Sequence, residues 1–117
     1  MTILDSGRLM VKQMIADANA GVVYASVPTE GSTVTAPTVT KNLTALLNNT
    51  ADLTAVTFVL PAGAPDNLRV FIRAQNSIAE LHVTATGETV DNWTVNMAPG
   101  DCVVYLHATP NIWSRIS

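Results

Sequence analysis

The chain has 117 residues, of which 48% are hydrophobic and only 13% charged, and its net charge is −3, so we expect one unusually apolar domain with or without an appended arm. Its six basic residues are scattered, which argues against a nucleic-acid partner, and no apolar run reaches the ~18–20 residues of a membrane helix. A small domain cannot cover this much apolar surface alone, so we attribute the composition to burial between subunits.

The first predicted element is a short helix or an extended arm at residues 9–20. Apolar residues from Leu9 to Ala18 fall near one helical face, and Gly21 is a possible stop. An isolated helix of about 12 residues is marginal in water, so an arm that orders only on a partner is an equal alternative. Flexible methionines and a cation suit a groove on a partner, although the segment could instead pack on its own domain. The residues expected to carry this attachment are Arg8, Leu9, Met10, Met14 and Ile15.

The next segment, residues 22–40, differs from the first in amino-acid composition. Residues 22–27 look like a strand, and the Pro, Gly and Thr residues that follow fit a linker or a set of edge strands. Residues 42–49 are expected to form one or two helical turns, with Asn42 as the N-cap. We therefore divide the chain into an N-terminal arm and linker, residues 1–40, and a β-domain, residues 41–117.

From residue 54 onward the chain is a series of short β-branched runs separated by Gly, Pro, Asn and Asp. Val56, Phe58 and Leu60 share one face of the first strand. Five or six such strands predict a mainly β fold, a small antiparallel β-sandwich or barrel-like domain. No long-period repeat is visible, and the strand–turn units differ too much to predict solenoid repeats.

One strand face combines aromatic and basic side chains. In the run from Leu68 to Ala74, the residues Leu68, Val70 and Ile72 share one face, and Arg69, Phe71 and Arg73 the other. A solvated face would normally lack Phe, so the face with Phe71 is expected to meet another subunit. The run 102–106 is apolar on both faces, so this strand is expected to be central in its sheet or at an interface. The residues expected at a subunit interface are Arg69, Phe71, Arg73, Val104 and Trp113.

Residues with catalytic or ligand chemistry are few. His82 and His107 stand in predicted strands, and no nucleophile motif accompanies them, so we expect no enzyme and no cofactor. One cysteine, Cys102, is expected to be a buried small hydrophobe, and the chain has too few Cys and His for a zinc site. The two tryptophans are expected to pack in the core or at a subunit seam rather than on a sugar.

Residues 53–117 resemble a module common in tailed-bacteriophage virion proteins, such as head fibres, capsid decoration proteins and tail-fibre segments. The resemblance lies in an ordered set of strand and turn motifs. Asn67 stands where Gly is more usual, and the polar hairpin is shorter. The motifs are Val59-Leu60-Pro61-Ala62, Asp66-Asn67, Val70-Phe71-Ile72, Val83-Thr84, Gly87, Gly100-Asp101, Val103-Val104-Tyr105-Leu106 and Trp113-Ser114-Arg115-Ile116.

This resemblance implies a non-enzymatic virion protein that is usually a homotrimer. The short chain fits a decoration or cement protein on the capsid surface, with the N-terminal arm bound to the major capsid protein. The alternative is a receptor- or glycan-binding module of a head or tail fibre that contacts a host surface glycan. For that role Trp93, beside Asp91 and Asn92, is the one candidate. A small β-fold enzyme is the third hypothesis.

Overall fold

The computed structural model describes residues 21–109 and 111–117, and all regular structure in this part of the chain is β-strand. Among these residues there is no helix, and therefore none that could cross a membrane. The arm or helix expected within residues 1–20 lies outside the described residues. The strands are β1 (Val22–Ser26), β2 (Thr33–Thr35), β3 (Leu43–Leu47), β4 (Leu53–Val59), β5 (Arg69–Ala74), β6 (Ile78–Thr84), β7 (Thr89–Val90), β8 (Thr94–Met97), β9 (Cys102–Thr109) and β10 (Ile112–Arg115).

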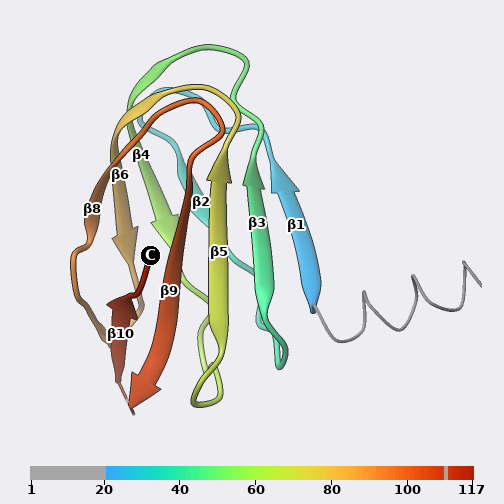
Figure 1. The fold of residues 1–117 in the computed structure, drawn as a ribbon, viewed down its shortest axis with the longest axis vertical. Helices are drawn as coiled ribbons and strands as arrows, with labels where there is room; N and C mark the ends of the chain where they lie inside the picture. Colours follow the sequence, from blue (N-terminus) through green and yellow to red (C-terminus); the bar gives the residue numbers. More distant parts are fainter. Residues whose placement is uncertain (1–20, 110) are drawn as a thin grey trace, which may run out of the picture.

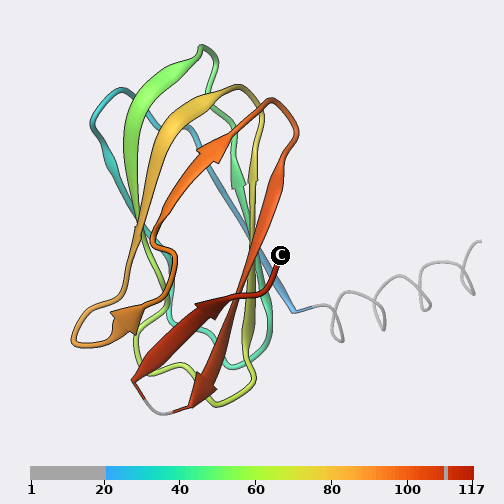
Figure 2. The same cartoon turned by 60° about the vertical axis from the view of Figure 1, so that its left-hand side comes forward.

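The strands form two sheets that face each other (Figures 1 and 2). Sheet A has six strands in the order β1-β3-β5-β9-β10-β7, and sheet B has four in the order β2-β4-β6-β8. From β1 to β6 the chain alternates between the sheets. Each new strand pairs in parallel with the strand two before it. This course is that of a β-solenoid with one strand per sheet in each coil.

The C-terminal strands close the solenoid in a different way. β8 runs antiparallel to β6, and β9 runs antiparallel to β5. β10 then pairs antiparallel with β9 and parallel with the short β7. The coil therefore ends in a mainly antiparallel cap, which contains β7 to β10.

The all-β prediction is confirmed, but the antiparallel sandwich or barrel and the dismissal of a solenoid were wrong. Parallel and antiparallel strands show the same alternation of side chains, so alternation did not reveal strand direction. The coils also differ in length: Val22 pairs with Leu43 and Leu43 with Val70, spacings of 21 and 27 residues, within the range of known solenoid repeats. No fixed period could therefore be seen in the sequence.

Two N-terminal segments also differ from expectation. Residues 42–49, expected to be helical, contain β3, whose residues alternate between buried and half-buried positions. Ala and Leu are among the strongest helix formers, but this intrinsic preference is worth little energy, and pairing with strands on both sides overrides it. Within residues 22–40, β1 and β2 are the edge strands of the two sheets, which was one of the alternatives for this segment. These two strands are continuous with the β-domain.

The core lies between the two sheets and is filled from both. The two predicted shared faces are confirmed, and both point inward: Val56, Phe58 and Leu60 are buried, as are Leu68, Val70 and Ile72. The largest fully buried side chains are Trp113, Tyr105, Phe58, Leu43, Leu47, Leu60, Ile72, Ile78, Leu81 and Met97.

Polar side chains hold the turns of neighbouring coils together. Asn49 is completely buried, and its Nδ2 donates to the carbonyl oxygens of Ala51 at 2.9 Å and Ser77 at 3.4 Å. Its Oδ1 accepts from the backbone N–H of Asn76 at 3.3 Å, and the side chain of Asn76 donates to the Asn49 carbonyl at 2.7 Å. Because β3 and β5 are in register, Asn49 and Asn76 occupy matching places in successive coils.

We predict that Asn49→Ala lowers the free energy of unfolding by about 3 kcal/mol, because it leaves buried backbone groups without partners. Urea unfolding followed by circular dichroism measures the effect. Asn48→Ala is the control, since the side chain of Asn48 has no hydrogen bond to the described residues, and we expect a loss below about 1 kcal/mol. Equal losses in the two variants would contradict the assigned role of Asn49.

Candidate functional site

The outer face of sheet A carries apolar side chains in rows that run across the strands. Phe71 on β5 lies opposite Val104 on β9 and Thr44 on β3, and Thr44 lies opposite Val23 on β1. The adjacent row contains Leu46 and Arg73. On the other side of Phe71, Arg69 lies opposite Leu106. We call Val23, Leu46, Phe71, Val104 and Leu106 the apolar outer face.

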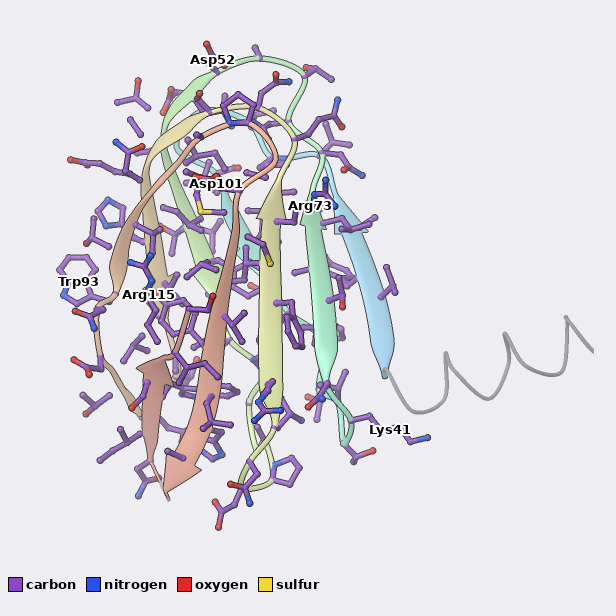
Figure 3. The ribbon with its side chains drawn as sticks, viewed as in Figure 1. Lys41, Asp52, Arg73, Trp93, Asp101 and Arg115 are labelled. Atoms are coloured by element: carbon purple, nitrogen blue, oxygen red, sulfur yellow. The ribbon has the colours of Figure 1, made fainter. Side chains whose placement is uncertain are left out.

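The members of the apolar outer face are only partly covered by the described residues. Val23 is 66% exposed, and the other four side chains are half-buried by their neighbours in the sheet. Arg69 and Arg73 are exposed and flank Phe71 along β5, with Arg73 near the upper end of the sheet in Figure 3. The result is a flat apolar surface that carries cationic side chains.

The structure places four of the five predicted interface residues on this face. Trp113 is the exception, because it is fully buried in the core of the single chain. An irregularity in the β9–β10 pairing between Ile112 and Trp113 leaves Ile112 exposed while Trp113 faces inward, opposite His107. Val23 and Leu46 were not predicted on this face, although the apolar residues Leu43, Ala45 and Leu47 alternate in the way that indicates strand β3. The five predicted attachment residues between Arg8 and Ile15 lie outside the described residues.

Cys102 is also on the outer side of sheet A, so the prediction of a buried cysteine was wrong. It is the first residue of β9, and its side chain is exposed at the start of this strand. Partial burial of the thiol raises the pKa of Cys102, and the nearby Arg73 on β5 opposes that rise. A thiol with a raised pKa is a weaker nucleophile, so nothing here favours a reactive cysteine.

A second cluster surrounds His107, which is buried on the inner side of β9. Its Nε2 lies 2.7 Å from Oε2 of Glu88, and its Nδ1 lies 3.2 Å from the carbonyl oxygen of Pro65. The ring packs against Trp113, with centroids 4.7 Å apart. Beside it is an open cleft of about 420 Å³, to which Asp66 and Asn111 also contribute.

The partners of His107 define what this cluster can do. A carbonyl and a carboxylate both accept, so both ring nitrogens must carry hydrogen for the two bonds to form together. Burial by itself lowers the pKa of His107, but the hydrogen bonds to Glu88 and Pro65 and the negative charges of Glu88 and Asp66 together outweigh burial, and the pKa is raised. With both nitrogens engaged, the ring joins the 61–68 loop, the turn between β6 and β7, and β9. Among the described residues no group of three or more His, Cys, Asp or Glu could hold a metal ion.

We predict that the His107–Glu88 pair stabilises the fold more at pH 6 than at pH 9. A raised pKa means that this contribution is full below the unfolded value of 6.5 and is lost as pH rises through the folded value. Glu88→Gln should therefore reduce the free energy of unfolding by roughly 1–2 kcal/mol at pH 6 and by less at pH 9. Urea unfolding at both pH values measures this difference.

The matched control is Glu80→Gln. The carboxylate of Glu80 is exposed and lies 3.5 Å from Nε2 of His82, so its removal should cost less than about 0.5 kcal/mol. A Glu88→Gln loss that is the same at both pH values would show that the pair does not carry the charge assigned to it.

Comparison with known proteins supplies no relative from which a role could be transferred to these residues. No protein-family model, no curated protein and no solved structure matches the chain.

Proposed function

We propose that this chain is a non-enzymatic structural component of a tailed-bacteriophage virion. In this proposal it is a decoration or cement protein on the capsid surface. It binds the major capsid protein and associates with copies of itself, and so stabilises the head. The motifs between residues 53 and 117 supply the link to virion proteins, and the apolar outer face supplies the physical reason for association.

The observation that carries the proposal is the contrast between a central row on the outer face of sheet B and the outer face of sheet A. One row across sheet B consists of Thr33, Thr57, His82 and Thr94, side chains that suit contact with water. The corresponding surface of sheet A presents the apolar outer face. Because both surfaces belong to the same small fold, the need to form strands does not explain the difference. Contact between sheet A and another subunit would explain why its outer surface is apolar.

A closed cyclic oligomer is the arrangement that we propose for this association. Cyclic symmetry covers the face in every copy and leaves no patch for unlimited growth. The choice of a trimer over a dimer depends on the resemblance to phage modules. Arg69 and Arg73 fit the same role, because arginine is enriched at protein interfaces.

The geometry offers little support for the enzyme alternative. His107 has both nitrogens engaged, and His82 stacks on Trp93 with ring centroids 5.3 Å apart. Neither histidine has a hydrogen bond to a serine, threonine or cysteine side chain among the described residues. A nucleophile–base pair would need that contact.

We predict that the protein sediments as a trimer of its 12.4 kDa chain and that Phe71→Asp dissociates it. A carboxylate at the centre of the apolar outer face would be buried without a partner in the oligomer. Sedimentation equilibrium at micromolar concentration measures the mass. Thr57→Asp is the control, because it places the same charge in a half-buried position on the outer side of sheet B and should leave the trimer intact. A monomeric wild-type protein would contradict the proposal.

We predict that deletion of residues 1–20 abolishes binding to bare capsids and leaves the oligomeric state unchanged. The proposal places attachment in the segment from Arg8 to Ile15, whereas association depends on sheet A. Co-sedimentation with capsids purified without this protein measures binding, and the sedimentation coefficient of the truncated protein reports its assembly. Undiminished capsid binding would refute the assignment of the arm.

A further inference from the structure

Trp93 is a large aromatic residue that the fold exposes rather than buries. It lies in the turn between β7 and β8 and is 52% exposed, whereas Trp113 is fully buried. Figure 3 shows Trp93 at the margin of the molecule, where it projects away from the ribbon. An indole ring that could bury a large area is instead presented to solvent.

The turn that carries Trp93 is fixed at each of its three residues. The N–H of Asp91 donates to the carbonyl of Trp113 at 2.8 Å, and the carbonyl of Trp93 accepts from Val83 at 2.6 Å. Between them, the hydroxyl of Tyr105 donates to the carbonyl of Asn92 at 2.6 Å. Burial of that hydroxyl raises the pKa of Tyr105 to about 12, so the donor keeps its proton at neutral pH. Strands β10, β6 and β9 thus hold the exposed aromatic residue in one place.

A second ring supports the indole from the sheet. The ring of His82 on β6 stacks on Trp93, with centroids 5.3 Å apart and planes 30° apart. The buried Nδ1 of His82 has no hydrogen-bond partner among the described residues, and Nε2 lies 3.5 Å from Glu80. The ring of His82 therefore backs the indole on one face, and Trp93 stays 52% exposed despite the stack.

The space beside Trp93 is small, open and bounded by both apolar and polar groups. It measures about 220 Å³ and is lined by Val83, Thr84, Ala85, Glu88 and Val90 together with Trp93. A typical drug-sized pocket is about 300–1,000 Å³, so this cleft suits a single ring. The exposed Thr84 offers a hydrogen-bonding group in this cleft, and the exposed Asp91 precedes Trp93 by two residues in the same turn.

Charge narrows the class of ligand. The exposed carboxylate of Glu80 lies beside the supporting His82 ring, and that of Asp91 is two residues from Trp93 in the sequence. The carboxylate of Glu88 is paired with His107, and among the described residues no Lys or Arg lines the cleft. A phosphate, sulfate or uronic acid would be repelled. The C–H groups on one face of a sugar ring carry partial positive charge and are attracted to the negative face of an indole.

We propose that Trp93, backed by His82, is a binding platform for one neutral hexopyranose ring of a saccharide. The hydroxyl groups of the sugar would bond to Thr84 and Asp91 at the edge of the ring. This inference is independent of the proposed structural role, because the platform lies on sheet B and the apolar outer face on sheet A.

The chain contains two tryptophans, one exposed and one buried, so fluorescence reports on the platform directly. We expect maltohexaose, cellohexaose or N-acetylchitohexaose, added to the full-length protein, to protect Trp93 from acrylamide quenching at millimolar concentration. An immobilised array of neutral and acidic glycans extends the search. Binding of neutral but not acidic glycans supports the proposal, and no binding on the array overturns it.

Three variants test whether saccharide binding depends on the ring of Trp93 rather than on exposed apolar surface in general. Trp93→Ala should weaken binding to the array by about tenfold or more, and Trp93→Phe should retain part of it. Val27→Ala removes exposed apolar surface after β1 in the other sheet and should change nothing. If Trp93→Ala binds as well as the wild type, or if it changes the sedimentation mass, then Trp93 is not a sugar platform.

Discussion

The structure depends on the register between successive coils. The pairing of Leu43 with Val70 and of Phe58 with Val83 places buried positions beside buried positions in both sheets. A shift of one residue would turn a strand's core residues to the outside. The same register creates the outer surfaces, since the rows that contain Phe71 and His82 exist only because neighbouring strands are aligned.

Polar side chains complete the pairing where strands are too short to do so. β2 pairs with β4 only from Thr57 to Val59, so the earlier part of β4 lacks a strand on that side. The carboxylate of Glu30 accepts from the N–H groups of Thr54 at 2.6 Å and Ala55 at 2.8 Å, and these bonds lower the pKa of Glu30. Asn49 performs the corresponding task inside the turn after β3. Strand pairing and side-chain hydrogen bonds thus form one continuous network along the coils.

The sequence was sufficient to predict the type of structure and several faces, but not the path of the chain. The alternation of apolar and polar residues around Phe58 and Val70 indicated the shared faces because each inward position of a strand requires an apolar side chain of its own. Strand direction is set by pairing between distant segments, and this pairing leaves no pattern in the sequence of a single strand. Because the coils differ in length, the sequence also shows no repeat of fixed period. The outer position of Phe71 was predicted. Trp113 lies in the core, one of the two expected places for the tryptophans, and its assignment to the interface was wrong because an irregular pairing in β10 cannot be seen in its sequence. The ring stack of Trp93 and His82 joins two segments that no motif connects.

The two ends of the solenoid have different consequences for how such a chain could change in length. β1 and β2 lie at the edges of the two sheets on one side, while the strands from β7 to β10 occupy the other side. A duplicated coil inserted before β3 would widen both sheets by one strand and leave the cap unchanged. The apolar outer face would grow with each duplication, whereas the Trp93 turn, tied to β6, β9 and β10, would stay as it is. The number of coils could therefore change without any change in the residues around Trp93.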